Sequence, residues 1–263
     1  MFLKPNRTSS GFARRGIDQS ALIEHRGMIE KIERRGFLRG SLTLGAVSML
    51  SGCDITDQDS VQGVLSAMSN WNDRAQAWLF SPTRLAPEFP ASAVAHPPRW
   101  NAYVGRDQTP AIDGDSWRLE LAGLIGDKRP RTLAEFAAMP QVTMRTRHVC
   151  VEGWDYIGEW TGVPMRAFLE IIGADTGAKY VGFRCADGYT GSIDMATALH
   201  PQTQLTMKYA GETIDKDFGF PIRLKAPTKL GFKQPKQILA MEVTNTNPLG
   251  YWETRGFNWF SGI

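Results

Sequence analysis

The sequence predicts a mixed α+β fold, in which mixed sheets and short helices form one compact domain over residues 99–263. Segments that alternate apolar and polar residues, as half-buried strands do, outnumber the segments with helical spacing. The helical segments in that region are all short. The chain has 263 residues, of which 42% are hydrophobic and 22% charged. This length and composition suit a sizeable buried core, and they exclude a disordered, collagen-like or polytopic membrane protein.

Strands are expected where β-branched and aromatic residues alternate with polar ones between turn residues. The first is expected at residues 117–122, and it ends at a turn that carries Gly123 and Gly126. The others are expected at residues 142–149, 179–184, 205–209, 222–224 and 238–244.

Short helices are expected between these strands, at residues 132–139, 164–172 and 195–199. The first of them has the clearest ends. Thr132 suits an N-cap, and Glu135, three residues later, completes a capping box. Pro140 then stops the helix, because proline cannot donate the backbone hydrogen bond that a further turn requires.

Residues 54–98 are predicted to be a tether and a surface wrap ahead of that domain. Apolar residues recur with roughly helical spacing over residues 61–80. Five prolines between positions 82 and 98 exclude long regular structure after that helix.

Residues 1–53 have the features of an export signal. Two adjacent arginines, Arg34 and Arg35, precede Phe37 and Leu38, and the 13 residues 40–52 are uncharged. This stretch is too short for a membrane-spanning helix, which needs about 20 residues, but it suits the h-region of a signal peptide. The arginine pair resembles a twin-arginine signal, so we expect a periplasmic protein. An ordinary amphipathic N-terminal helix is the alternative.

Cys53 ends the leader in a segment, Leu50-Ser51-Gly52-Cys53, that resembles a bacterial lipobox. Lipid attached to this cysteine would anchor the protein to a membrane surface without a spanning helix. An ordinary cleavage site is the alternative. Met28 lies six residues before Arg34 and is a second candidate for the start of translation.

The charge of the chain is concentrated in the leader. The formal net charge is +3, and residues 1–53 hold nine Lys/Arg against four Asp/Glu, which leaves 21 against 23 in the remainder. Because the basic character belongs to the leader, we expect no nucleic-acid partner. The chain has three cysteines, too few for a disulfide framework.

Cys150 is the main candidate for a reactive or metal-binding residue. It follows a predicted strand directly, and such positions expose reactive groups on a rigid base. Arg145, Arg147 and His148 precede it, and positive neighbours favour the thiolate, which is the form that binds metals. An inert buried thiol and a disulfide with Cys185 are the alternatives.

A second group of residues is basic and lies further along the chain. Arg223 is followed by Lys229, Lys233 and Lys236, with Gly231 among them. Converging ammonium groups and backbone N–H groups suit a ligand that carries a phosphate. The alternative is an ordinary solvated face.

The order of several short motifs resembles the sulfite-oxidase-like molybdopterin-dependent oxidoreductases. The resemblance is to the exported bacterial branch, which includes the catalytic subunit of periplasmic protein-methionine-sulfoxide reductase. No single motif suffices, but the ordered set is specific and spans about residues 100–244. The motifs are RHVCVEGW at 147–154, WTGVP at 160–164, AKYVGF at 178–183, DGYTGS at 187–192, ALHP at 198–201, GFPIRL at 219–224 and KLGFK at 229–233.

This resemblance implies a molybdenum–molybdopterin cofactor with Cys150 as the metal ligand, since a soft thiolate suits such a metal. It also implies cofactor contacts from further residues: Asn101, Tyr103, Cys185, Arg223, Gly231, Phe232, Lys233 and Lys236. Phe218 departs from the pattern, because relatives often have Asn or His there. The short segment between Phe183 and Asp187 and the C-terminal sequence also depart from the methionine-sulfoxide reductases.

The implied activity is oxygen-atom transfer, in the direction that reduces an S- or N-oxide carried by a small molecule or a protein. Arg147 and His148 are the side chains expected to steer the substrate or assist catalysis. Oxidation of a sulfite-like substrate and a non-catalytic exported binding lipoprotein are the alternatives. The sequence has no haem or iron–sulfur motif, so the resemblance implies an external redox partner, a membrane cytochrome b or a quinone-linked protein.

Overall fold

The computed structural model of the chain describes residues 58–263, with side chains from residue 63. The predicted leader and the predicted lipid anchor at Cys53 lie outside the described residues. Residues Gly63–Ile263 pack as one unit.

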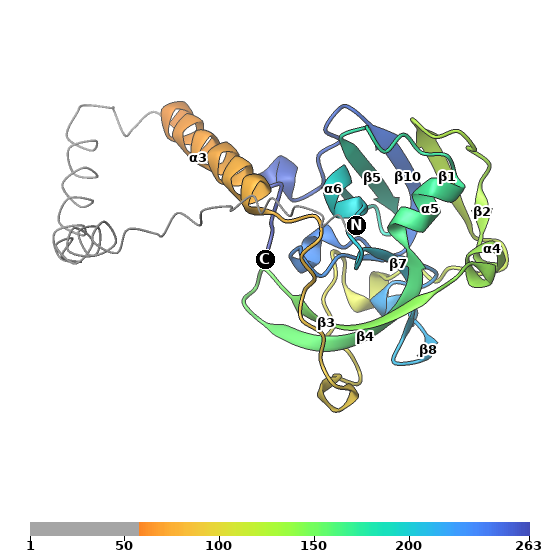
Figure 1. Cartoon of the computed structure of the whole chain (residues 1–263). Helices are drawn as coiled ribbons and strands as arrows, with labels where there is room; N and C mark the ends of the chain where they lie inside the picture. The colour runs from red at the N-terminus through yellow and green to blue at the C-terminus, as the bar shows by residue number, and fades with distance from the viewer. Residues whose placement is uncertain (1–57) are drawn as a thin grey trace, which may run out of the picture. The chain divides into compact units, whose positions relative to one another are not determined.

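Within the described residues the strands form two five-stranded sheets (Figure 1). The first sheet has the order β2 (Arg131–Thr132), β1 (Arg118–Gly123), β10 (Ile238–Thr244), β5 (Tyr180–Cys185) and β6 (Thr190–Asp194). The second has the order β3 (Val142–Val149), β4 (Asp155–Pro164), β7 (Gln204–Tyr209) and β8 (Glu212–Thr213), with β9 (Arg223–Lys225) paired to β7. Strands β1 and β10 are parallel to each other, and the other pairs are antiparallel.

The helices are short, apart from the first. They are α3 (Gln58–Leu79), α4 (Leu133–Ala138), α5 (Met165–Ile171) and α6 (Met195–Ala198). Single 3₁₀ turns are η1 (Ala91–Ala93), η2 (Arg106–Gln108), η3 (Lys216–Phe218), η4 (Gly231–Lys233) and η5 (Glu253–Arg255). The predicted mixed α+β class is confirmed. No helix within residues 58–263 combines the length and the apolar character that crossing a bilayer requires.

Strands β4 and β6 were absent from the sequence-based prediction. In β4 the buried positions alternate with partly exposed ones, but two of them are Gly158 and Gly162, which lower strand propensity. A Cβ at Gly158 would lie 2.6 Å from Nε1 of Trp160, and one at Gly162 would lie 2.1 Å from the carbonyl oxygen of Leu205. Neighbouring groups therefore require glycine at both positions. Because glycine adds no apolar side chain to the alternating pattern, this strand could not be predicted from that pattern.

Two clusters of buried side chains hold the sheets together. The larger joins the first sheet to α4, α5 and α6 and includes Leu119, Phe136 and Phe168. The smaller lies on β3, β4 and β7 and consists of Met144, Tyr156, Trp160, Tyr209 and Ile214.

The segment between α3 and β1 runs along the β3–β4 hairpin. The N–H of Phe89 donates to the carbonyl of Arg145 at 3.0 Å, and the N–H of Ala95 donates to the carbonyl of Ile157 at 2.9 Å. These bonds attach a proline-rich stretch to the second sheet without forming a long strand, because proline cannot donate to a ladder.

Replacing Thr132 by alanine is expected to destabilise the protein by about 1 kcal/mol, because α4 would lose its N-cap. The Thr132 hydroxyl accepts a hydrogen bond from the N–H of Glu135 at 3.0 Å, and the Glu135 carboxylate accepts one from the N–H of Thr132 at 2.8 Å. The check is urea unfolding of Thr132→Ala beside Thr132→Ser, which keeps the hydroxyl. An equal loss in both variants would show that capping is not the cause.

Candidate active site

Cys150 follows the last residue of β3, at the start of the tight turn into β4. Its N–H donates to the carbonyl of Trp154 at 2.9 Å, and its own carbonyl accepts from the N–H of Gly153 at 3.1 Å. Gly153 has a φ of +86°, a left-handed conformation that glycine adopts without strain. The turn therefore holds the Cys150 thiol in a defined position at the end of a paired strand.

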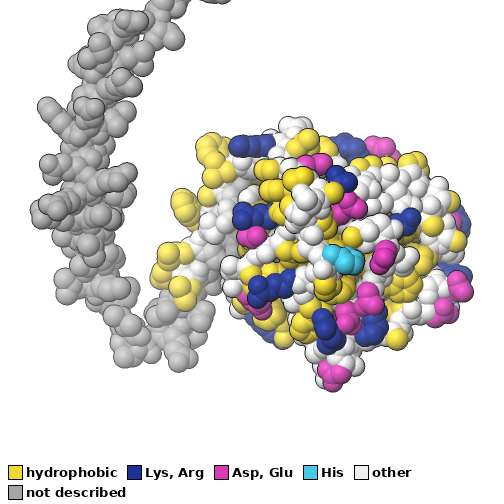
Figure 2. Space-filling view, turned by 90° about the horizontal axis from the view of Figure 1, so that it is seen from below, with side chains coloured by type: hydrophobic (Ala, Val, Ile, Leu, Met, Phe, Trp, Pro, Cys, Tyr) yellow, Lys and Arg dark blue, Asp and Glu magenta, His cyan; other side chains and the backbone are white. Residues whose placement is uncertain are grey.

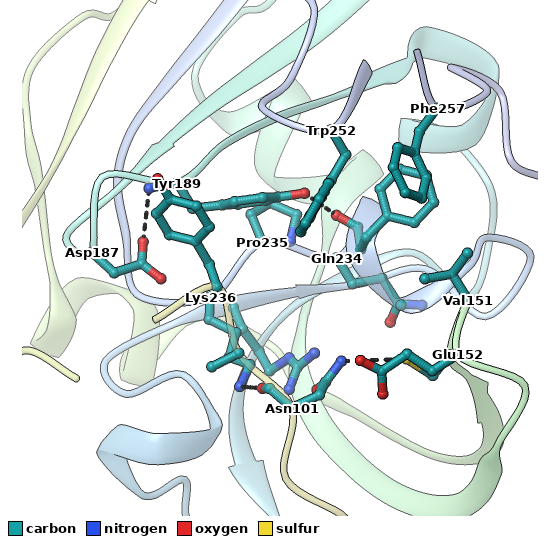
Figure 3. A pocket seen from close by; sticks show the side chains of 16 residues that line it. Asn101, Val151, Glu152, Asp187, Tyr189, Gln234, Pro235, Lys236, Trp252 and Phe257 are labelled. Carbon is teal, nitrogen blue, oxygen red and sulfur yellow. Dashed lines mark hydrogen bonds between the residues drawn. The ribbon is translucent and has the colours of Figure 1, made fainter. Parts of the chain in front are cut away.

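A pocket opens over the Cys150 thiol, and its walls come from segments far apart in the sequence (Figure 3). It is lined by residues 101–103, 150–152, 187, 189, 223, 231, 232, 234–236, 252 and 257. Seven of the predicted site residues meet there: Asn101, Tyr103, Cys150, Arg223, Gly231, Phe232 and Lys236. The structure therefore brings together most of a set that the sequence spreads over more than 130 positions.

Asn101 connects the thiol to the basic side of the pocket. Its side-chain nitrogen lies 3.8 Å from Sγ of Cys150, within hydrogen-bond reach of sulfur, and its carbonyl accepts a hydrogen bond from Nζ of Lys236 (Figure 3). Asn101 therefore contacts the predicted metal ligand through its side chain and a pocket lysine through its backbone carbonyl.

The expected activation of Cys150 by its preceding positive residues is wrong. Burial raises the pKa of the Cys150 thiol, and the hydrogen bonds from the backbone of Glu152 and from Asn101 lower it by less. Arg145 is paired instead with Glu159 at 2.6 Å and Arg147 with Asp155 at 2.9 Å. These guanidinium groups are held by carboxylates of β4, so deprotonation of Cys150 would depend on the metal itself.

Two buried cations, Arg223 and Lys225, and the half-buried Lys236 lie together beside the pocket. Within the described residues, none of the three forms an ion pair with a carboxylate. Arg223 donates to the carbonyl of Phe218 at 2.9 Å and Lys236 to the carbonyl of Asp217 at 2.9 Å. Nζ of Lys225 contacts the carbonyl of Arg147 at 3.4 Å and Nδ1 of His148 at 3.5 Å. Nε of Arg223 has no hydrogen-bond partner among the residues that the structure describes. Because buried charge is costly unless it is compensated, this group suits an anionic ligand.

Burial also lowers the pKa of these side chains. Burial, followed by the charge of the neighbouring Arg223, lowers the pKa of Lys236 to about 7. Burial, followed by the charge of Arg223, holds the pKa of Lys225 well below its ordinary value. An anion bound among them would favour the charged forms and raise both pKa values.

The other two predicted phosphate-binding lysines are used differently. The expectation of a solvated face is excluded, because Lys229 and Lys233 are buried. Lys233 forms an ion pair with Glu253, and Lys229 donates to the carbonyl of Phe260 at 2.8 Å and pairs with Asp194 at 3.3 Å. Both therefore hold the C-terminal segment, and neither side chain lines the pocket.

Three further predicted residues also lie outside the pocket lining. Arg147 is exposed on the outer side of β3. Cys185 is buried and, like Cys150, is a free thiol, so the two form no disulfide. His148 is buried, and burial followed by the charge of Lys225 keeps its pKa well below the ordinary value. A Cβ on Gly231 would lie 2.7 Å from Nε2 of His148, so glycine lets the pocket loop close over the histidine.

Comparison with known proteins agrees with this arrangement. Residues 106–252 match the oxidoreductase molybdopterin binding domain, a match that covers more than half of the chain. The chain belongs to this family. It is therefore a molybdopterin-dependent oxidoreductase, and its cofactor is molybdenum–molybdopterin.

Individual relatives differ in how much of the chain they match. A putative protein-methionine-sulfoxide reductase subunit YedZ1 of Azospira oryzae is 52% identical over 262 residues, which is 100% of both chains. The protein-methionine-sulfoxide reductase catalytic subunit MsrP of Campylobacter jejuni is 28% identical over 53% of this chain and 52% of its own. The crystal structure of the sulfane dehydrogenase SoxCD from Paracoccus pantotrophus aligns at 19% identity and a TM-score of 0.49, over 52% of this chain and 40% of its own.

The pocket of this molybdopterin-dependent oxidoreductase fits its cofactor in two respects. The Cys150 thiol offers the soft ligand that a molybdenum dithiolene centre accepts. Arg223 and Lys236, with the unpaired Nε of Arg223, offer buried positive charge for the cofactor phosphate. When bound, the cofactor supplies two-electron redox chemistry with exchange of an oxygen atom.

Sequence analysis did not select several residues of this site. Lys225, Tyr189 and Gln234 were not predicted as site residues, although Tyr189 lies in the DGYTGS motif and Gln234 lies between the predicted Lys233 and Lys236. Tyr189 lines the wall and donates from its hydroxyl to the carbonyl of Phe232 at 2.6 Å. Lys225 follows Arg223 by two residues in a strand, so both point to one face. That spacing was the signal that could have identified Lys225.

Sulfate binding to cofactor-free protein is expected to weaken by about tenfold or more between about pH 6 and about pH 8, since a charge-assisted hydrogen bond is worth about 1.5–3 kcal/mol. Lys236, with its pKa lowered to about 7, is charged below that pH and loses its charge above it. Sulfate remains a dianion throughout this range. Calorimetric titration of wild type and Lys236→Met is the measurement, with exposed Lys208→Met as the control. A pH dependence that persists in Lys236→Met would contradict the assignment.

Proposed function

We propose that this chain is an exported enzyme that reduces an S-oxide, or a related N-oxide, by two-electron oxygen-atom transfer, with Cys150 as the molybdenum ligand. For a sulfoxide the balanced change is the sulfoxide plus two electrons and two protons giving the thioether and water. The observation that carries the proposal is the free Cys150 thiol at the floor of a pocket with buried cations on one side and aromatic side chains on the other.

The aromatic wall favours a neutral substrate over sulfite. Tyr189, Trp252 and Phe257 line it, and the ring of Tyr103 packs against that of Tyr251 at 4.4 Å between centroids. A site for sulfite needs several converging arginines. Arg223 is the arginine that lines this pocket, and it suits the cofactor phosphate. An apolar wall instead accommodates the carbon groups of a sulfoxide.

Asp187 is suited to hold one of the protons that the reaction consumes. It lines the pocket, and its Oδ1 accepts a hydrogen bond from the N–H of Tyr189 at 2.9 Å (Figure 3). Burial raises the pKa of its carboxyl above the ordinary value, against the opposing effect of that hydrogen bond and of Lys236. It therefore retains a proton at a higher pH than an exposed aspartate.

The name of the Azospira relative supports methionine sulfoxide as the substrate class, since that protein matches this chain over its whole length. The twin-arginine motif and Cys53 support export to the periplasm with a lipid anchor. Electrons would come from a membrane cytochrome b or a quinone-linked partner. That relative is named as a reductase subunit, which fits an enzyme that works with another protein.

The test uses holoprotein exported in a host that makes molybdopterin. We expect about one molybdenum per chain, oxidation of a reduced viologen dye by methionine sulfoxide, and no oxidation of sulfite with ferricyanide. Sulfite oxidation without oxide reduction would support the alternative direction. Protein that carries the cofactor but turns over neither substrate would contradict the proposal.

A further inference from the structure

Helix α3 attaches to the rest of its unit through polar side chains. The Asp73 carboxylate accepts hydrogen bonds from the N–H groups of Trp259, at 3.3 Å, and Phe260, at 2.6 Å. The side chain of Gln76 accepts one from the N–H of Gly262 at 3.0 Å. The docked face of the helix is therefore the face with polar residues, and it satisfies backbone donors of the C-terminal segment.

The opposite face of α3 is apolar and exposed. Six large side chains on it have exposed fractions between 52 and 83%: Val64, Leu65, Met68, Trp71, Trp78 and Leu79. At 100° per residue the centre of these six positions lies about 160° around the helix from Asp73 and about 100° from Gln76, so the apolar face points away from the docked side. From Val64 to Leu79 the face is about 22 Å long at a rise of 1.5 Å per residue. Figure 2 shows hydrophobic side chains along the edge of the molecule where this helix lies.

This pattern is the reverse of that of an ordinary surface helix, which buries its apolar face. Single exposed apolar residues are common in soluble proteins, but a continuous set of this size marks a surface that another apolar phase covers.

We propose that the exposed apolar face of α3 lies in the interfacial layer of a lipid bilayer. Cys53, the candidate for lipid attachment, precedes Gln58, the first residue of the helix, by five positions. A lipid chain there would hold the start of the helix within reach of the membrane surface. Trp71 and Trp78 suit the headgroup region, where tryptophan is enriched. This inference rests on the export contained in the proposed function, but not on the catalytic activity.

The face would also orient the enzyme. With its apolar side in the bilayer, α3 would direct its polar side, and the C-terminal segment bonded to it, away from the lipid. That segment carries Trp252 and Phe257 of the pocket wall. The C-terminal segment would thus connect the membrane contact to the active site. The active site would therefore lie near a membrane redox partner.

The test measures quenching of tryptophan fluorescence by brominated phosphatidylcholine in vesicles that carry the exported full-length holoprotein. We expect quenching in the wild type and its loss in Trp71→Gln/Trp78→Gln. Leu65→Gln/Met68→Gln keeps both tryptophans as reporters and should also lose the quenching, because the face no longer inserts. Glutamine preserves the helix in both variants.

The matched control is Val142→Gln/Ile171→Gln, which changes two exposed apolar residues elsewhere and should be quenched like the wild type. Molybdenum content shows that each variant is folded. Absence of quenching in the wild type, or equal quenching in all variants, would overturn the proposal. Self-association of the wild type that the α3 variants abolish, without any quenching, would assign the face to a second copy instead. Since the assay needs no turnover, failure of the proposed activity would be seen separately.

Discussion

Replacing Cys150 by serine is expected to lower turnover of an oxide substrate by about 100-fold or more, since even residues that only support a metal ligand cost 10–100-fold when changed. Serine is close in size but offers a hard oxygen in place of a soft thiolate. The backbone bonds that hold position 150 do not involve the side chain, so the fold should persist. The measurements are steady-state turnover, molybdenum content and the paramagnetic resonance spectrum of the metal.

Cys185→Ser is the informative comparison for this variant. Its thiol is also buried and free, but it does not line the pocket. We expect it to keep the wild-type metal spectrum and to lose far less activity. A Cys150→Ser protein with an unchanged spectrum and full turnover would remove Cys150 as the ligand, and a larger change in Cys185→Ser would transfer the role to that residue.

Breaking the buried ion pair between Lys233 and Glu253 is expected to destabilise the protein by about 3–5 kcal/mol, because either single change leaves an uncompensated buried charge. The side chains are 1% and 2% exposed. Burial lowers the pKa of Lys233, and the charge of Glu253 opposes that shift. For a unit of about 200 residues this loss corresponds to a melting temperature lower by roughly 6–20 °C. Calorimetry of Lys233→Met and of Glu253→Gln measures it.

The double variant Lys233→Met/Glu253→Gln separates the ion pair from simple packing. It removes both charges and should recover most of the stability that either single variant loses. The control is Lys216→Met, which breaks a more exposed pair with Asp217 and should cost about 1 kcal/mol or less. Additive losses in the double variant would contradict the role of the pair. Because Glu253 follows Trp252, loss of the pair should also loosen the pocket wall.

Prediction from sequence succeeded where a local pattern decides the structure. Strands β3 and β10 have the predicted bounds, and the capping box of Thr132 and Glu135 is present. Strand β4 could not be predicted, because two of its buried positions are glycines that a tryptophan ring and a neighbouring backbone require. That requirement arises from residues up to 44 positions away in the sequence.

The candidate site shows the same division. The fold class, the position of Cys150 at the end of a strand and the family of the ordered motifs could all be predicted from the sequence. Which cations line the pocket depends on how the whole domain packs. Lys233 and Lys229 form ion pairs with Glu253 and Asp194 outside the pocket, whereas Lys236 forms no ion pair within the described residues and lines the pocket with Cys150. Burying a charge is costly unless a group of opposite charge compensates it. Whether a buried lysine forms a structural ion pair or is available to a ligand therefore depends on a carboxylate from another part of the chain.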